Sequence, residues 1–276
     1  MAVLSGWRVL FGVLSGLLAA TAAPAAEWTV RPGESIAAAI TRAAPGDVVR
    51  VERGRYPERL VIDKRLTLKG INRPTLSGGL KGDTLRIIAE DVTIEGLNVT
   101  DSGDSLLEQN AGIYIQPGAH RAVVRNCDLS YNLFGLWIEK SNDVRIENNL
   151  ITGKRDYRSA SRGNGIQLYN TNGARIIGNQ ISFVRDAIYV DVSHRAVFRG
   201  NRLHHSRYGT HYMNSYYNLW EDNESFMNRG GLALMEVREQ TVRREVVTAA
   251  EQLLPVEPHS GQKQHEGEID NKNKRV

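Results

Sequence analysis

The sequence has a single cysteine among 276 residues, no long apolar segment beyond its N-terminus, and no large excess of either charge. One cysteine excludes an internal disulfide, so packing and backbone pairing must stabilise the fold. The formal net charge of +4 is modest and spread along the chain, which gives no reason to expect nucleic acid as a partner. The N-terminal apolar run VLFGVLSGLLAATAA is too short and too rich in alanine to favour a permanent membrane span.

Residues 1–26 instead have the pattern of a secretory signal peptide. Arg8 precedes the apolar run, and the small residues at 23–26 (APAA) offer a cleavage site. We predict that this segment is cleaved on export, with a retained anchor as the alternative. About 250 residues then remain, which is enough for one solenoid domain and its cap.

The chain repeats itself about every 22 residues between Gly112 and Met235. One column of small residues is separated by steps of 23, 30, 22, 22 and 22: Gly112, Gly135, Gly165, Ala187, Gly209 and Gly231. A second column follows steps of 22, 30, 22 and 22: Cys127, Asn149, Asn179, Asn201 and Asn223. Both columns place one eight-residue insertion between Asn149 and Gly165, so two independent registers support the same repeat.

Each repeat contains two short segments in which apolar and polar residues alternate, such as GIQLYN and ARIIGNQIS. Alternation with a period of two predicts strands. Units of this length without a helical stretch are typical of a solenoid in which each turn stacks on the previous one. The sequence therefore predicts an all-β fold, a right-handed parallel β-helix with rungs of about 22 residues.

We assign the β-helix to residues 27–235, and its two ends have different sequence patterns. A short amphipathic helix beginning at Ser35, whose hydroxyl can cap it, is expected to cover the first rung. After Met235 the repeat stops, and residues 236–276 are expected to form an atypical C-terminal cap or a disordered tail. The cap would be a helix with one apolar face: Val242, Val246, Ala249 and Leu253.

The repeat also predicts which side chains face outward. The strand after each small residue should expose two columns of side chains. The first is Tyr114, Trp137, Gln167, Tyr189, His211 and Ala233, and the second is Gln116, Glu139, Tyr169, Asp191, Met213 and Met235. Tyr114, Trp137 and Tyr189 make this face aromatic. The asparagine column is instead interpreted as structural, because inward-turned amides at a corner can satisfy neighbouring rungs.

The eight-residue insertion is strongly basic. Its segment GKRDYRSASRG carries four cations: Lys154, Arg155, Arg158 and Arg162. Loops that leave a rigid scaffold often carry function, so these cations are predicted to contact an acidic partner or an anionic ligand. A solvated loop without a partner is the alternative.

Imidazole and thioether side chains gather near the C-terminal rungs. Within 32 residues lie three histidines and all the methionines except Met1: His204, His205, His211, Met213, Met227 and Met235. Such ligands select soft or borderline metals, above all copper(I). His211 and Met213 should point outward from one strand with Met235 one rung beyond, so these three are the predicted metal ligands. Ordinary surface histidine and gap-filling methionine are the alternative for each residue taken alone.

An exported β-helix could also be a carbohydrate-active enzyme. Cleavage or epimerisation of a uronate needs a base close to a cation that neutralises the sugar carboxylate. The candidates are Asp186 with Arg185, and Asp191 with His194 and Arg195. They are scattered, and the Asp-Pro-His-Asp motif of alginate epimerases is absent.

Two segments resemble NosD, a family of periplasmic β-helical proteins of nitrous oxide reductase maturation. The more telling parts are RGNGI-x-L-x-N, directly after the basic insertion, and RYG-x-HYM-x-S at residues 207–215. The resemblance extends roughly from Trp28 to Met235. NosD proteins normally continue through several more rungs, so this chain is expected to be a truncated or frameshifted copy.

The resemblance implies a non-catalytic periplasmic assembly factor. Such a factor would act with an inner-membrane ABC transporter, with nitrous oxide reductase and with a copper chaperone, and would handle copper as copper(I) or as a copper-sulfide species. The resemblance also implies that the outer face, with Tyr114, Trp137 and Tyr189, is a surface that contacts a partner. The alternatives that remain open are an exported polysaccharide lyase or uronate epimerase, and a purely structural or adhesive solenoid.

Overall fold

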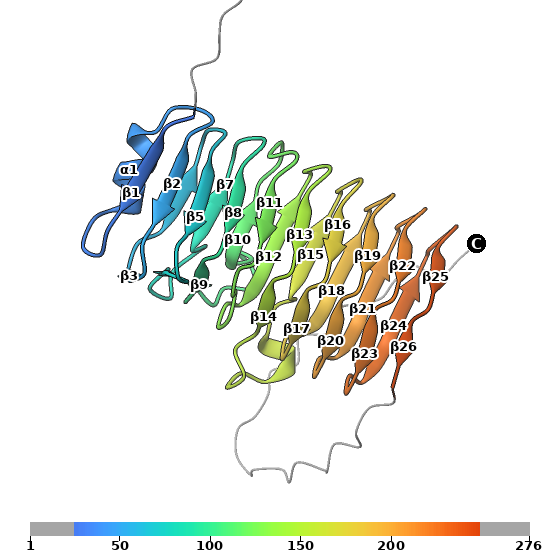
Figure 1. Cartoon of the computed structure of the whole chain (residues 1–276). Coiled ribbons are helices and arrows are strands. Elements are labelled where there is room, and N and C mark those ends of the chain that lie inside the picture. The colour runs from blue at the N-terminus through green and yellow to red at the C-terminus, as the bar shows by residue number, and fades with distance from the viewer. Residues whose placement is uncertain (1–24, 249–276) are drawn as a thin grey trace, which may run out of the picture.

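The computed structural model describes residues 25–248, which form a parallel β-helix whose rungs stack along one axis (Figure 1). Three faces run the length of the stack. The first face is a ten-stranded sheet: β1 (Glu27–Val30), β2 (Val48–Val51), β5 (Thr67–Gly70), β8 (Thr93–Glu95), β11 (Val123–Arg125), β13 (Arg145–Glu147), β16 (Arg175–Ile177), β19 (Val197–Arg199), β22 (Leu219–Glu221) and β25 (Thr241–Arg243). The predicted fold is confirmed.

The second face is an eight-stranded sheet, which carries the outward columns read from the sequence. Its strands are β4 (Leu60–Ile62), β7 (Leu85–Ile87), β10 (Ala111–Ile115), β12 (Phe134–Glu139), β15 (Ile166–Tyr169), β18 (Asp186–Asp191), β21 (Tyr208–Met213) and β24 (Gly230–Met235). Every adjacent pair is parallel in the predicted register; Ile188, for example, lies between Ile166 and Thr210. The alternate apolar side chains are buried in the lumen up to β21, because a period of two sends successive side chains to opposite faces of a strand. In β24, the last strand of this sheet, Leu232 is only partly buried and Leu234 is exposed.

The third face consists of two smaller sheets. One contains β3 (Arg55–Tyr56), β6 (Thr75–Ser77) and β9 (Asn98–Thr100), and the other contains β14 (Leu150–Thr152), β17 (Gln180–Ser182), β20 (Arg202–His204), β23 (Glu224–Phe226) and β26 (Val246–Val247). Isolated bridges through Asp128 connect the two. The eight-residue insertion leaves the stack between β14 and β15 and contains one 3-10 turn, Ser159–Ser161.

The predicted N-terminal helix is present as α1 (Ile36–Arg42), and it packs beside β1, β2 and β4 at the first rung (Figure 1). The Ser35 hydroxyl accepts a hydrogen bond from the amide of Ala38, as expected of an N-cap. The carboxylate of Glu58 accepts two further amides of the first turn. Ile36 and Ile40 are buried, so the helix covers the end of the core.

The asparagine column forms the predicted structural ladder. The side-chain amide of Asn149 donates to the side-chain oxygen of Asn179, that of Asn179 to Asn201, and that of Asn201 to Asn223, at 3.0, 3.0 and 2.8 Å. Each oxygen also accepts the backbone amide one rung earlier. Cys127 starts the column, and burial raises the pKa of its thiol to about 11, so it is an inert filler.

The predicted helix after Met235 is wrong for residues 236–248. These residues form a further rung, in which β25 pairs with β22 and β26 pairs with β23. Glu245 occupies the next position of the asparagine column and accepts the side-chain amide of Asn223. Gln240, one repeat after Asn218, donates to the carbonyl of Ser215, so both side chains connect the further rung to the one before it. Ala249 and Leu253, assigned to the same helix, lie outside the described residues, as does the predicted signal peptide up to residue 24.

Candidate functional site

The outer face of the eight-stranded sheet has the predicted order of side chains. In the first column Tyr189 pairs with His211, and His211 with Ala233; in the second, Asp191 pairs with Met213, and Met213 with Met235. Neighbouring positions on paired strands are about 4.8 Å apart. The outer face therefore brings the predicted aromatic, imidazole and thioether groups into one surface.

This face is hollowed into a groove. Two hollows of about 510 and 300 Å³ share four of their lining residues, Leu106, Phe134, Asn164 and Tyr189, and so form one continuous depression. The larger hollow also contains Glu139 and Asp191, whereas the smaller contains Arg162, Arg185 and Arg207. One end of the groove is thus acidic and the other basic.

His211 lies in the smaller hollow and is only 8% exposed. Its Nδ1 lies 3.1 Å from the carboxylate of Asp186, which is fully buried. Arg207 donates to the same carboxylate from two nitrogens, at 2.8 and 2.5 Å. That ion pair raises the pKa of Arg207, so the guanidinium keeps its charge. Arg207 was missed by the sequence reasoning, although the RYG motif contains it.

The other nitrogen of His211 has no partner. Nε2 is buried and makes no hydrogen bond with any described residue. If Nδ1 carries the proton and donates it to Asp186, Nε2 presents a free lone pair. A carboxylate that holds the far nitrogen of a histidine in this way is the usual support of a metal-binding imidazole.

Tyr189 connects His211 with the first thioether. Its ring meets the His211 ring edge-on at 4.7 Å, and its hydroxyl donates to the sulfur of Met213 at 2.7 Å. Burial, followed by the nearby Asp191 and Asp186, raises the pKa of Tyr189, so the hydroxyl keeps its proton. Met235, one rung on, is 47% exposed.

The donor set can be tested against copper on its chemistry. Within residues 25–248 no three His, Cys, Asp or Glu side chains gather into a group that could hold a metal ion. One imidazole with an orphaned nitrogen and two thioethers is a different set, and it suits a soft ion such as copper(I). These residue types are therefore the ones that copper(I) prefers, and not the oxygen ligands that calcium and magnesium require.

Two of the three predicted aromatic contacts, Trp137 and Tyr189, line the groove, whereas Tyr114 does not. Trp137 is 9% exposed, and its ring meets Phe134 edge-on at 5.1 Å. The hydroxyl of Tyr114 donates to Glu139 at 2.5 Å, while the guanidinium of Arg86 lies over its ring. Burial, reinforced by Glu139, raises the pKa of Tyr114.

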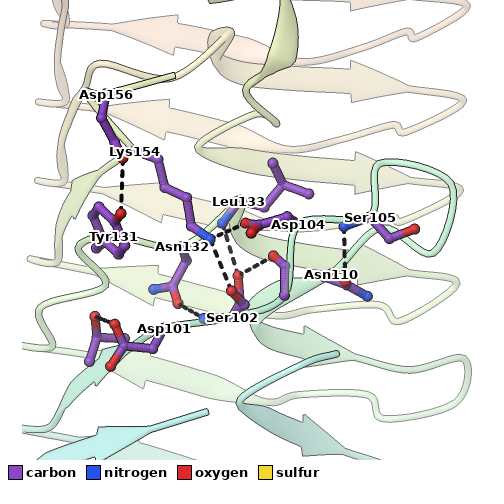
Figure 2. A network of polar contacts seen from close by, with 12 residues as sticks. Asp101, Ser102, Asp104, Ser105, Asn110, Tyr131, Asn132, Leu133, Lys154 and Asp156 are labelled. Atoms are coloured by element: carbon purple, nitrogen blue, oxygen red, sulfur yellow. Dashed lines mark hydrogen bonds and ion pairs between the residues drawn. The ribbon is translucent and has the colours of Figure 1, made fainter. Parts of the chain in front are cut away.

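Lys154 was predicted to belong to a basic surface, but the structure buries it. Its side chain is 1% exposed, and its ammonium contacts the carboxylate of Asp104 and donates to the carbonyl of Ser102 at 3.0 Å (Figure 2). The rings of Tyr131 and Tyr157 flank it. A cation buried in this way fastens the insertion to the 101–110 loop and cannot contact a partner.

The remaining cations of the insertion are divided. Arg155 is exposed and lies over the ring of Phe183 at 3.8 Å, and Arg158 is exposed. Arg162 donates to two carbonyls of its own loop, and burial lowers its pKa. The four cations thus do not form one patch, and Arg162 faces the groove.

The carboxylates proposed for uronate chemistry are not assembled into one site. Asp186 pairs with Arg207 and not with Arg185. Asp191 lines the groove, but His194 stacks on Tyr216 at 5.1 Å and accepts the amide of that residue. Asp186 also lines the groove, but its contacts there are Arg207 and His211 and not the predicted Arg185.

Fold and outer face together define a class of protein: a right-handed parallel β-helix that presents imidazole and thioether groups on one sheet. Residues 75–161 match the family model described as right handed beta helix region. Residues 147–255 match the model described as periplasmic copper-binding protein (NosD). The resemblance to NosD is thereby confirmed over that segment.

Two curated relatives, each named probable ABC transporter binding protein NosD, are similar to this chain. The protein from Pseudomonas aeruginosa is 36% identical over 133 residues, which is 48% of this chain and 31% of the relative. The protein from Stutzerimonas stutzeri is 34% identical over 137 residues, which is 50% of this chain and 31% of the relative. The matched segment thus spans under a third of either relative.

The fold also resembles solved structures of other proteins. A polygalacturonase from Erwinia carotovora superposes with a TM-score of 0.55 at 14% sequence identity, over 82% of this chain and 83% of that chain. This likeness concerns the fold alone. Within the described residues, no helix is long and apolar enough to cross a membrane.

Proposed function

We propose that this chain is a periplasmic copper-binding assembly factor, which acts with an inner-membrane ABC transporter in the maturation of the copper centre of nitrous oxide reductase. The NosD match supports this proposal, because residues 147–255 include His211, Met213 and Met235. The names of the two curated relatives support the transporter as a partner. The reductase and a copper chaperone are the further partners in this proposal, and a cleaved signal peptide accounts for export.

The observation that carries the proposal is the orphaned nitrogen of His211. A buried polar atom without a partner costs roughly 1–3 kcal/mol, so a rigid scaffold retains one at some expense to its stability. Asp186 and Arg207 hold the ring in place while Nε2 stays free. A soft cation bound between Nε2 and the thioethers of Met213 and Met235 would satisfy that atom.

Copper is the cargo in this scheme, held as copper(I) or as a copper-sulfide species. Neutral imidazole and thioether release copper(I) more readily than thiolates would, and the described chain has only the buried Cys127. A donor set of this kind suits transfer more than permanent storage.

The test is a titration of the full-length exported chain with copper(I) against a competing chelator, without oxygen. His211→Ala and the double variant Met213→Leu/Met235→Leu are each expected to lose one equivalent of copper or to weaken it at least about tenfold. His194→Gln, which changes a histidine stacked on Tyr216, is the matched control and should bind as the parent does. Unchanged binding in both ligand variants would contradict the proposed site.

Docking of the proteins in this scheme can be tested separately. The groove with Trp137 and Tyr189, and the exposed Arg158 on the insertion, are the proposed contacts. Trp137→Ala and Arg158→Glu should each weaken capture of the transporter or the reductase, whereas Lys154→Met should act only through stability because that side chain is buried. Full binding by both surface variants would remove the groove and the insertion as docking sites.

A carbohydrate-active enzyme is the second candidate, favoured by one observation. The groove combines Trp137 and Tyr169 with Glu139 and Asp191, which is the chemistry of a sugar-binding cleft. Incubation with pectate and with alginate would reveal a lyase by an ultraviolet-absorbing product, and an epimerase by a changed uronate composition. We expect neither change.

A further inference from the structure

A second pair of histidines lies on the third face of the β-helix. Nδ1 of His204, the last residue of β20, is 2.7 Å from Nδ1 of the next residue, His205. Adjacent side chains on a strand normally point to opposite faces. His205 departs from that rule because its φ of 55° places it in the left-handed region, so the chain turns and both rings meet on one side.

The turn occupied by His205 recurs in the neighbouring rungs. Phe183, His205 and Met227 are spaced by 22 residues and have φ values of 55°, 55° and 53°. Their strands are paired in register, since Ser182 pairs with His204 and His204 with Phe226. Equivalent turns of paired rungs are about 4.8 Å apart, so Met227 follows His205 at the spacing of one rung.

Aromatic neighbours hold both imidazole rings. Phe183 stacks on His205 with ring centroids 4.6 Å apart, and Phe226 stacks on His204 at 4.8 Å. Met227 is 42% exposed. The pair therefore has fixed rings on one side and a solvent-exposed thioether on the other, which leaves the ligands open to an incoming ion.

The protons of the pair can be accounted for in the free protein. Gln180 Nε2 lies 3.4 Å from Nε2 of His204, so an amide that donates there leaves the His204 proton on Nδ1. That proton is then donated to Nδ1 of His205. Burial, followed by the neighbouring His205, lowers the pKa of His204.

We propose that Nδ1 of His204, Nδ1 of His205 and the sulfur of Met227 form a second copper(I) site, on the third face and apart from the outer face of the eight-stranded sheet. Two nitrogens that each bind one three- or four-coordinate ion at about 2.0 Å are roughly 3.3–3.5 Å apart, so the two rings have to separate by less than about 1 Å from the observed 2.7 Å when the ion binds. On binding, the His204 proton moves to Nε2, and the Gln180 amide turns its oxygen to accept it. The thioether selects copper(I) over zinc.

The second site stands on its own geometry and does not depend on the NosD role. Two cations reduce its expected affinity: Arg155 lies over Phe183, and Arg202 lies over Phe226 at 5.5 Å while it pairs with Glu224. The site is therefore expected to be weaker than one in neutral surroundings.

The experiment uses the full-length exported chain with the first site removed by His211→Ala, Met213→Leu and Met235→Leu. His259 and His265, which lie outside the described residues, are also changed to alanine so that they contribute no copper. This variant, which serves as the parent for the changes below, is titrated with copper(I) against a competing chelator. It should bind one equivalent, with nitrogen and sulfur neighbours in its X-ray absorption spectrum.

Two changes to that parent test the ligands. Met227→Leu keeps the volume, and should remove the sulfur neighbour and weaken binding at least about tenfold. His204→Gln/His205→Asn should abolish binding, and asparagine is chosen because it tolerates the left-handed region. Circular dichroism and the melting temperature check that each variant is folded.

Three outcomes would overturn the second site: no copper bound by the parent, equal binding by the folded His204→Gln/His205→Asn variant, or a retained sulfur neighbour in Met227→Leu. Failure of the outer-face site would be seen in a different comparison. In that case the His211→Ala variant would bind copper as the wild-type chain does. Each site can thus fail without the other.

Discussion

The asparagine corner and the outer face of the eight-stranded sheet use polar side chains in opposite ways. In the corner, Asn179 donates two hydrogen bonds and accepts two, so no polar capacity remains for a ligand. On the outer face, one nitrogen of His211 and one oxygen of Asp191 are buried without a partner. Both regions repeat at the same spacing, so polarity and periodicity alone do not separate a structural residue from a functional one. Completed hydrogen bonding is what distinguishes the asparagine corner from the outer face.

The largest expected effect comes from breaking the corner. Asn179→Ala removes four hydrogen bonds and leaves the amide of Asn149 and the carbonyl of Ile146 buried without their partners. At roughly 1–3 kcal/mol for each buried orphan, the free energy of unfolding should fall by about 3–5 kcal/mol. Urea denaturation measures this loss.

Asn98→Ala is the matched control, because the side-chain oxygen of Asn98 has no partner and its amide makes only long hydrogen bonds of 3.3 and 3.5 Å. That variant should lose less than about 1 kcal/mol. If the two variants were equally destabilised, the ladder would not be the main polar support of the rungs.

The next effect concerns the insertion. Lys154→Met keeps a long side chain but removes the buried ammonium that holds Asp104 and Ser102 (Figure 2). Asp104 is partly exposed and can be rehydrated, so we expect a loss of about 2 kcal/mol in the free energy of unfolding. Protease cleavage within residues 101–110 should become faster.

Arg158→Ala changes an exposed cation of the same insertion and should alter the free energy of unfolding by less than about 0.5 kcal/mol. If the two variants were equally stable, the buried role of Lys154 would be contradicted, and Lys154 would again be a candidate for the predicted binding surface.

Much of this contrast could be predicted from the sequence, because rung spacing decides the register. The fold, both outward columns and the role of the asparagines follow from that spacing. The cap at Ser35 follows from the amphipathic stretch that begins there. The rung after Met235 was not predicted because Glu245 replaces asparagine at the next position of the asparagine column. The sequence repeat therefore stops although the backbone forms another rung.

Other features depend on contacts that a repeat does not specify. Lys154 is buried by a loop 50 residues earlier in the chain, and Arg207 meets Asp186 across rungs through side chains of ordinary composition. The contact between His204 and His205 depends on a left-handed turn, which alternation with a period of two cannot reveal.

A smaller effect is expected from a change on the outer face that keeps all three proposed copper ligands. Asp186→Asn keeps the shape of the side chain but removes the charge that orients Nδ1 of His211, so copper(I) affinity at the outer face should fall about 10- to 100-fold. The competition titration measures it on protein shown to be folded. Glu139→Gln, on the same face and paired with Tyr114, should leave the affinity unchanged. An equal loss in both variants would point to general charge and not to orientation of His211.

The smallest effect is expected where the corner lacks an asparagine. Cys127 occupies the first position of the column, where its amide already donates to Asn149 at 2.9 Å and its thiol lies 4.0 Å from the carbonyl of Ile94. Cys127→Asn would place a side-chain amide between that carbonyl and Asn149, the arrangement that Asn179 has with Ile146 and Asn201. Two new neutral hydrogen bonds are opposed by the burial of a larger polar group, so the free energy of unfolding should rise by no more than about 1 kcal/mol. Cys127→Ser, which is too short to reach both partners, should instead destabilise the protein in the same urea titration. If asparagine were as harmful as serine, the completed amide ladder would not be what distinguishes this corner from the outer face.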